Sequence, residues 1–241
     1  MSPRIRPPSD SRREVSAGQV SGGGRTAVEW STEASATAAR KRGTPVAERG
    51  RVGRLWGGLV DYACIGWWGL VRPKVVEKRP LEIAQAVILR DDAASAAHEG
   101  PPQVLLSIRS DLFGWELPGG TVEVDEDPEQ ALIREVEEET GLAVEIEARV
   151  GAWIREGFRP HTAHVYRCRV RGGTPTVSAE TPRLAWFAAA EPPRDLFPWY
   201  REPLAQALRR AAPETHREWQ GLRSILTAIR IDLGIRWRGL P

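Results

Sequence analysis

Residues 119–142 read GGTVEVDEDPEQALIREVEEETGL, and this stretch decides the fold. Two glycines form a turn, and an acidic loop leads to Asp127 and Pro128. An acidic N-cap residue followed by proline at the first helical position predicts that a helix begins there. Gly141 predicts the end of the helix, because glycine is the residue that most often follows the last helical turn.

The predicted helix carries Glu135, Glu138 and Glu139 at positions i, i+3 and i+4. Residues at this spacing share one helix face, so the three carboxylates repel one another. A divalent cation with a preference for oxygen ligands would compensate that repulsion. We therefore predict a metal site on this face.

The stretch also matches the Nudix box, G-x5-E-x7-R-E-U-x-E-E-x-G-U, where U is an aliphatic residue. The defined positions are Gly120, Glu126, Arg134, Glu135, Val136, Glu138, Glu139, Gly141 and Leu142. Seven of these positions require one residue type at roughly 7% background frequency, so a chance match in any window is of order ~10⁻⁹. The chain therefore resembles the Nudix hydrolases, over about residues 80–212.

The resemblance implies an α/β fold, the Nudix α/β/α sandwich with a mixed sheet. It also implies Mg²⁺, or Mn²⁺ in its place, held by Glu135, Glu138, Glu139 and the carbonyl of Gly119. Arg134 can fork onto a carboxylate, and by resemblance Arg134 and Glu126 support the loop and helix. The residues expected to take part in catalysis are Glu139, Glu138, Arg134 and Glu180.

Glu180 lies six residues before Trp186, in a loop that leads into a predicted strand. Many Nudix proteins place an extra metal-binding or base glutamate in such a loop, and the alternative is an ordinary exposed glutamate. The residue that activates water stays open between Glu139 and Glu180, because family members differ in this role.

The leading hypothesis is a Nudix pyrophosphohydrolase that cleaves a nucleoside diphosphate linked to another moiety, by attack of water on phosphorus. One alternative is a non-catalytic regulator that binds a nucleotide metabolite. Another is an isomerase of isoprenoid diphosphates, which needs a catalytic cysteine. Cys168 lies in a predicted strand without an evident partner, which argues against the isomerase.

Residues 155–162 join two predicted strands near the expected cleft. Arg159 and His161 could bind a phosphate group, and Phe158 could stack on a base or sugar. The alternative interpretation is a polar hairpin loop with a solvated arginine.

Alternating and apolar runs predict further strands outside the box. These runs are residues 83–89, 103–109, 115–117, 144–155, 163–170 and 184–188, and residues 203–210 predict a helix. Residues 213–241 predict a C-terminal amphipathic helix whose apolar stripe is Trp219, Leu222, Leu226, Ile229 and Leu233.

Two N-terminal segments precede the predicted domain. Residues 1–53 are rich in Ser, Gly, Arg, Pro and Ala and predict a disordered arm. Residues 54–76 predict an apolar, Trp-rich helical segment, too short at its apolar core of 17 residues for the ~20 needed to span a bilayer. This segment and the C-terminal helix would pack on the domain, form a homodimer interface or contact a membrane surface.

Composition bounds the remaining properties. A net charge of +2 over 241 residues gives no reason to expect nucleic-acid binding. The two cysteines, Cys64 and Cys168, have no metal-site partners nearby in sequence and are expected to be reduced thiols. With no signal peptide recognised, we expect a cytoplasmic protein that acts on a nucleotide-type small molecule.

Overall fold

The computed structural model describes residues 29–30, 62, 81–90, 101–178 and 180–239. Its strands are β1 (Glu29–Trp30), β2 (Leu81–Arg90), β3 (Gln103–Ile108), β4 (Trp115–Glu116), β5 (Gly119–Thr121), β6 (Leu142–Gly157), β7 (His161–Gly173), β8 (Arg183–Ala188) and β9 (Glu214–Gln220). Its helices are α3 (Pro128–Thr140), α4 (Arg201–Arg209) and α5 (Leu222–Arg238), with a 3₁₀ turn, η5, at Pro198–Tyr200.

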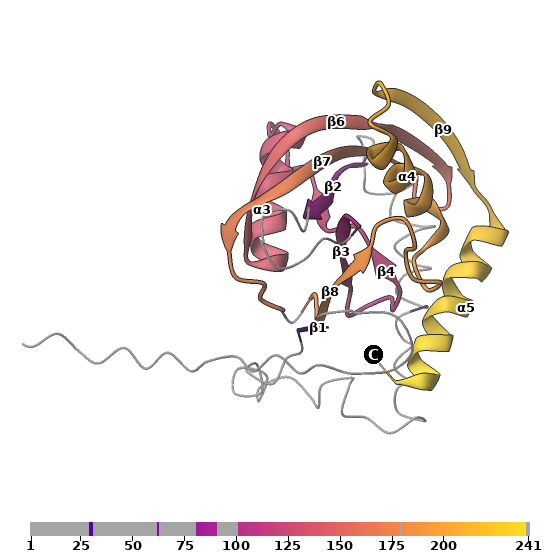
Figure 1. Ribbon diagram of the computed structural model, residues 1–241. Helices are drawn as coiled ribbons and strands as arrows, with labels where there is room; N and C mark the ends of the chain where they lie inside the picture. Colours follow the sequence, from indigo (N-terminus) through magenta and orange to yellow (C-terminus); the bar gives the residue numbers. More distant parts are fainter. Residues whose placement is uncertain (1–28, 31–61, 63–80, 91–100, 179, 240–241) are drawn as a thin grey trace, which may run out of the picture.

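The strands form one mixed sheet in the order β1-β8-β3-β2-β7-β6-β9, with β4 beside β3 and β5 beside β2. The pairs β2–β7 and β6–β9 are parallel, whereas β2–β3 and β6–β7 are antiparallel. Figure 1 shows α3 on one side of this sheet and α4 and α5 on the other. The predicted α/β/α sandwich with a mixed sheet is confirmed.

Strand β2 contributes to an apolar core on each face of the sheet. Ala84, Ala86 and Ile88 pack with the buried face of α3. Val87 packs in the second core, to which α4 and α5 contribute. This alternation follows from the period of two along a strand, and it turns Gln85 toward the same side as Val87.

Helix α3 has the predicted boundaries, with Asp127 as N-cap, Pro128 at the first position and Gly141 after the last turn. Leu132 and Val136 are fully buried against the sheet. The glutamates therefore project from the remaining faces of the helix.

Each predicted strand overlaps one of the observed strands, although β3 and β4 each end one residue earlier than predicted and β6 and β7 are longer, at 16 and 13 residues. The predicted helix at residues 203–210 corresponds to α4. The two long strands pair along most of their length, with three register shifts.

The C-terminal segment differs from the prediction of one helix from residue 213. Residues Glu214–Gln220 form β9, which pairs parallel with the edge of β6. The strand alternates, so His216 stacks on Trp153 with a centroid distance of 4.8 Å, whereas Trp219 is 73% exposed. Backbone pairing with a free sheet edge outweighed the helical spacing of the apolar residues.

Helix α5 also buries a different face from the predicted stripe. Its buried residues are Ala228, Asp232, Ile235 and Arg236. Leu222, Leu226 and Leu233 of the predicted stripe are exposed. A buried ion pair between Asp232 and Arg236, at 2.6 Å, replaces the apolar contacts that the stripe predicted.

The predictions for the N-terminal segments fall almost entirely outside the described residues. Within the arm predicted to be disordered, β1 is an exception, because it pairs with the edge of β8. In the Trp-rich segment only Tyr62 is described, and its hydroxyl group donates to Asp232 of α5. None of the described helices is long and apolar enough to cross a membrane, and the homodimer and membrane contacts remain predictions.

Candidate active site

The site begins at the turn formed by Gly119 and Gly120, which β5 holds against β2. A Cβ atom on Gly119 would lie 2.1 Å from the carbonyl oxygen of Ala84, and Gly119 has φ +141°. A Cβ atom on Gly120 would lie 2.3 Å from the carboxylate carbon of Glu135. Only glycine lets the turn approach both the strand and the glutamate so closely.

Arg134 organises the glutamates next to this turn. Its Nε and Nη2 atoms donate to the two carboxylate oxygens of Glu126 at 3.0 and 2.9 Å. Its Nη1 atom donates to Glu135 at 3.0 Å and lies 3.6 Å from Glu138. The expected fork onto a carboxylate is thus made to Glu126, and the same guanidinium group holds two of the three predicted metal ligands.

Glu139, the third predicted ligand, faces the turn itself. Its Oε2 atom accepts a hydrogen bond from the backbone N–H of Gly119 at 3.1 Å. Burial raises the pKa of Glu139 to about 7, and the charges of Glu135 and Glu180 act in the same direction. Glu180 is exposed, and its electrostatic effect places it in the same acidic neighbourhood as the helix glutamates.

The chemistry of these side chains suits a divalent cation. Three carboxylates and a backbone carbonyl are hard oxygen donors of the kind that Mg²⁺ prefers, and the missing Cβ of Gly120 lets the Glu135 carboxylate lie against the turn. Among the described residues, no group of three or more His, Cys, Asp or Glu side chains converges as a ready-made cage. The donor set fits the ion, and Glu138, whose side chain is 63% exposed, has room to turn toward it.

A cavity of about 440 Å³ opens from the same turn, and Gly119, Gly120 and Thr121 line it. Three predicted substrate-binding residues, Phe158, Arg159 and His161, also line it. The structure therefore brings the loop between β6 and β7 and the glycine turn to the same cavity.

His161 has a different environment from the one expected of a phosphate ligand. Its Nδ1 atom lies 2.7 Å from the carbonyl oxygen of Arg159, and its Nε2 atom lies 3.4 Å from Nη1 of Arg155. A carbonyl group only accepts and a guanidinium group only donates, so Nδ1 carries the proton and Nε2 accepts. Burial lowers the pKa of His161 to about 4, which keeps the ring neutral. The neutral ring can therefore contact Arg155 and the carbonyl group of Arg159 at the same time.

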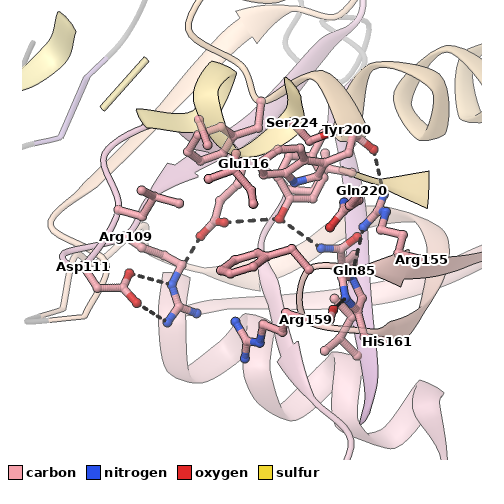
Figure 2. Close-up of a pocket in the computed structure, with 18 of the residues that line it drawn as sticks. Gln85, Arg109, Asp111, Glu116, Arg155, Arg159, His161, Tyr200, Gln220 and Ser224 are labelled. Atoms are coloured by element: carbon pink, nitrogen blue, oxygen red, sulfur yellow. Dashed lines mark hydrogen bonds and ion pairs between the residues drawn. The ribbon is translucent and has the colours of Figure 1, made fainter. Parts of the chain in front are cut away.

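Arg159 lies at the cavity with its backbone in an unusual conformation. Its backbone has φ +52°, in the left-handed region that non-glycine residues rarely adopt. The carbonyl group of Arg159 is fixed by His161. Figure 2 shows the Arg159 side chain within the cavity.

The cavity wall also holds a polar network of Gln85, Tyr200, Glu116, Arg109 and Asp111. Tyr200 accepts a hydrogen bond from Nε2 of Gln85 at 3.2 Å and donates to Glu116 at 3.3 Å. Arg109 lies 4.0 Å from the Glu116 carboxylate and donates to Asp111. Figure 2 shows these residues side by side in one wall.

The signal for this network was present in the sequence. Gln85 interrupts an otherwise apolar run of β2, and Glu116 lies between Trp115 and Leu117, two buried residues. A polar side chain at an inward position needs a partner or a ligand. Burial raises the pKa of Glu116 to about 8, against the opposing effect of Arg109.

Cys168 takes no part in this site. It is fully buried in the core on the α3 side of the sheet. Burial raises the pKa of Cys168 to about 12, so the group is a thiol at neutral pH and a poor nucleophile. This environment gives no support to the isomerase alternative.

Comparison with known proteins identifies the family. The NUDIX domain model matches residues 82–208, more than half of the chain. The chain belongs to the NUDIX domain family.

Three relatives illustrate the similarity. A MutT-like protein of Streptomyces ambofaciens is 39% identical over 110 residues, which cover 45% of this chain and 71% of that protein. An RNA pyrophosphohydrolase of Acidiphilium cryptum is 32% identical over 111 residues, which cover 44% of this chain and 62% of that protein. A solved structure of an ADP-ribose pyrophosphatase from Streptococcus suis is 27% identical, covers 58% of this chain and all of that one, and aligns with a TM-score of 0.46.

Proposed function

We propose that this protein is a Mg²⁺-dependent hydrolase of a phosphoanhydride bond in a nucleoside diphosphate linked to another moiety. One observation carries the proposal. Gly119 and Gly120 belong both to the glutamate cluster and to the wall of the 440 Å³ cavity. A substrate in that cavity would therefore present its phosphate groups to the turn and to the glutamates beyond it.

The proposed metal ligands are Glu135, Glu138, Glu139 and the carbonyl oxygen of Gly119. When bound, the ion would neutralise phosphate oxygens and lower the pKa of a water ligand. Arg134 keeps Glu135 and Glu138 close to the turn in the absence of that charge. Mn²⁺ has similar ligand preferences and is expected to substitute.

Two glutamates are proposed to manage the proton of the attacking water. Glu139, with a pKa of about 7, is poised to exchange a proton near neutral pH. Its hydrogen bond from Gly119 fixes the carboxylate beside the turn. Glu180 is the second candidate, because its charge reaches Glu139 and its backbone carbonyl is anchored by Ser110 at 2.8 Å.

The loop between β6 and β7 is proposed to hold the substrate. Arg159 would contact a phosphate group with its guanidinium group. Phe158 would pack on a ring of the substrate, and His161 would keep Arg155 and Arg159 in place through its two ring nitrogens.

The test is hydrolysis of a panel of nucleotide sugars, dinucleotides, ADP-ribose and nucleoside triphosphates, with and without Mg²⁺. The double variant Glu138→Gln with Glu139→Gln should lose at least ~10²-fold in kcat/KM, because the metal loses two ligands. Glu137→Gln is the matched control, because Glu137 is an exposed glutamate of the same helix outside the box positions.

Two outcomes would oppose the proposal. Full activity of the double variant would remove the metal assignment. Tight binding of a panel member without cleavage, in the wild-type protein with Mg²⁺, would favour the nucleotide-binding regulator instead.

A further inference from the structure

The cavity wall contains a buried hydrogen-bond acceptor that the proposed chemistry does not use. Gln85 of β2 is 4% exposed and lines the cavity. Its Nε2 atom donates to Tyr200, but its Oε1 atom receives no hydrogen bond from any residue that the structure describes. An unpaired buried acceptor is costly, at roughly 1–3 kcal/mol, so an unpaired acceptor in a residue that lines a cavity indicates a ligand.

The hydrogen bonds of Tyr200 determine whether the oxygen or the nitrogen of the Gln85 amide group lacks a partner. A tyrosine hydroxyl group has one proton, and that of Tyr200 is donated to Glu116. Arg109 lies 4.0 Å from Glu116 and opposes burial, which raises the pKa of Glu116 to about 8, so above that pH the carboxylate is ionised and can only accept. Tyr200 must therefore accept from Gln85, which leaves the amide oxygen rather than the nitrogen available to a ligand.

The space around Gln85 suits a flat, largely apolar group. Trp199 stacks on Phe197 with an interplanar angle of 8° and a centroid distance of 4.8 Å, and both line the cavity. Another part of the wall comes from α5, through Leu222, Ser224, Ile225, Ala228 and Ile229. Figure 2 shows Ser224 on the far side of the polar network from Arg159.

Helix α5 lies beyond residue 208, where the family match ends. This wall is therefore an addition of this chain to the matched domain. A cavity of 440 Å³ has the size of a small-molecule site, and its two ends differ in chemistry. One end has the glycine turn and Arg159, and the other has Gln85 together with the apolar side chains of α5.

We propose that the Gln85 amide oxygen accepts a hydrogen bond from a ring or exocyclic N–H group of a nucleobase, which lies between β2 and α5. The proposal rests on the proposed function in placing the phosphate groups at Gly119 and Gly120. It names the base as the part of the substrate that this wall selects, and Tyr200 and Glu116 as positioning residues for the amide group.

The test measures binding, not turnover. Titration calorimetry with Mg²⁺ compares the α,β-methylene diphosphates of adenosine, guanosine, cytidine and uridine with methylenediphosphonate, which has no base. At pH 9, above the pKa of about 8 of Glu116, the donor direction in the network is fixed. The wild-type protein should bind at least one nucleoside compound ~10-fold or more tightly than methylenediphosphonate.

Gln85→Met should remove at least ~10-fold of the affinity for that nucleoside compound, because it removes the acceptor at similar volume. The affinity for methylenediphosphonate should stay within about twofold. Gln103→Met is the matched control, because Gln103 is a partly buried strand glutamine that pairs with Arg90 and does not line the cavity. Equal affinities of Gln85→Met and wild type for the nucleoside compound would overturn the proposal.

A second variant tests the wall without touching the network. Ser224→Trp should fill the part of the cavity that α5 lines. It should weaken the affinity for the nucleoside compound at least ~10-fold and leave the affinity for methylenediphosphonate unchanged. Arg223→Trp, at the neighbouring exposed position, should change neither. Thermal melting confirms that each variant is folded, and nucleoside binding unaffected by Ser224→Trp would place the base elsewhere.

The two proposals fail separately. If no panel member is hydrolysed but the binding pattern holds, only the hydrolase is refuted. If hydrolysis occurs and Gln85→Met binds nucleoside compounds like the wild type, only the base assignment is refuted.

Discussion

The buried ion pair of α5 is expected to hold the cavity wall in place, and Asp232→Ala tests this. The side chains of Asp232 and Arg236 are both 0% exposed and lie 2.6 Å apart. Asp232 also accepts from the backbone N–H of Phe113 at 2.6 Å, and Arg236 donates to the carbonyl oxygen of Asp111 at 3.3 Å. One pair therefore joins α5 to the loop between β3 and β4.

Removing the carboxylate leaves a buried guanidinium group without its counter-ion, which costs about 3–5 kcal/mol. It also leaves the Phe113 N–H unpaired, at about 1–3 kcal/mol. Because the two effects overlap, we expect a total loss of about 4–6 kcal/mol in the free energy of unfolding. That is a large part of the 5–15 kcal/mol typical of a domain.

Urea denaturation of the wild type and three variants measures this. Arg238→Ala is the matched control. Arg238 also belongs to α5 and pairs with Asp195 at 2.6 Å, but its side chain is 58% exposed. Such an exposed pair contributes about 0–1 kcal/mol. The double variant Asp232→Leu with Arg236→Met should recover about 2–4 kcal/mol of the loss, because it leaves no buried charge. A cost of Asp232→Ala no larger than that of Arg238→Ala would refute this reasoning.

Three further predictions concern single residues. Gly120→Ala should weaken Mn²⁺ binding at least ~10-fold in electron paramagnetic resonance titrations, because the new Cβ would displace Glu135; unchanged affinity would contradict the placement of Glu135 at the metal. The folded-state pKa of Glu116 is about 8, above its ordinary value of 4.5, so the folded protein binds the proton more tightly and loses stability as pH rises between these values. Glu116→Gln should flatten this loss, on the order of 2–4 kcal/mol at 1.36 kcal/mol per unit, in melting curves at pH 5 and pH 8.5, and an unchanged pH dependence would oppose it. Trp219→Ser should change the free energy of unfolding by less than about 0.5 kcal/mol, because the side chain is 73% exposed; a cost above about 1.5 kcal/mol would show that another surface covers it.

The contacts of Arg134 with the glutamates of α3 could be predicted from the sequence because their geometry is local. Arg134, Glu135 and Glu138 lie within two turns of one helix, so their contacts follow from helical spacing. The boundaries of α3 followed from Asp127, Pro128 and Gly141 for the same reason. These contacts depend little on how the rest of the chain folds.

The C-terminal wall was not predictable in this way. The spacing of Trp219, Leu222 and Leu226 indicated one helix with an apolar buried face, yet these residues are exposed. The edge of β6 took residues Glu214–Gln220 as a strand, and the buried face of α5 was set by the partners of Asp232. Both events depend on surfaces that exist only after the sheet has formed.

The position of α5 depends on tertiary contacts, whereas the glutamates of α3 are placed by local helical spacing. The proposed chemistry and the proposed base selectivity therefore depend on different parts of the chain. Glu139 accepts a hydrogen bond from the glycine turn and Glu135 one from Arg134 of α3, so the proposed metal site can persist while the cavity wall from α5 changes. Gln85 connects the glycine turn with the cavity wall. It pairs with Gly119 between β2 and β5, and its side chain donates a hydrogen bond to Tyr200 in the cavity wall. A substitution in α5 should therefore alter the affinity for the base and leave the phosphate end intact. A substitution at the turn should impair hydrolysis of every substrate alike.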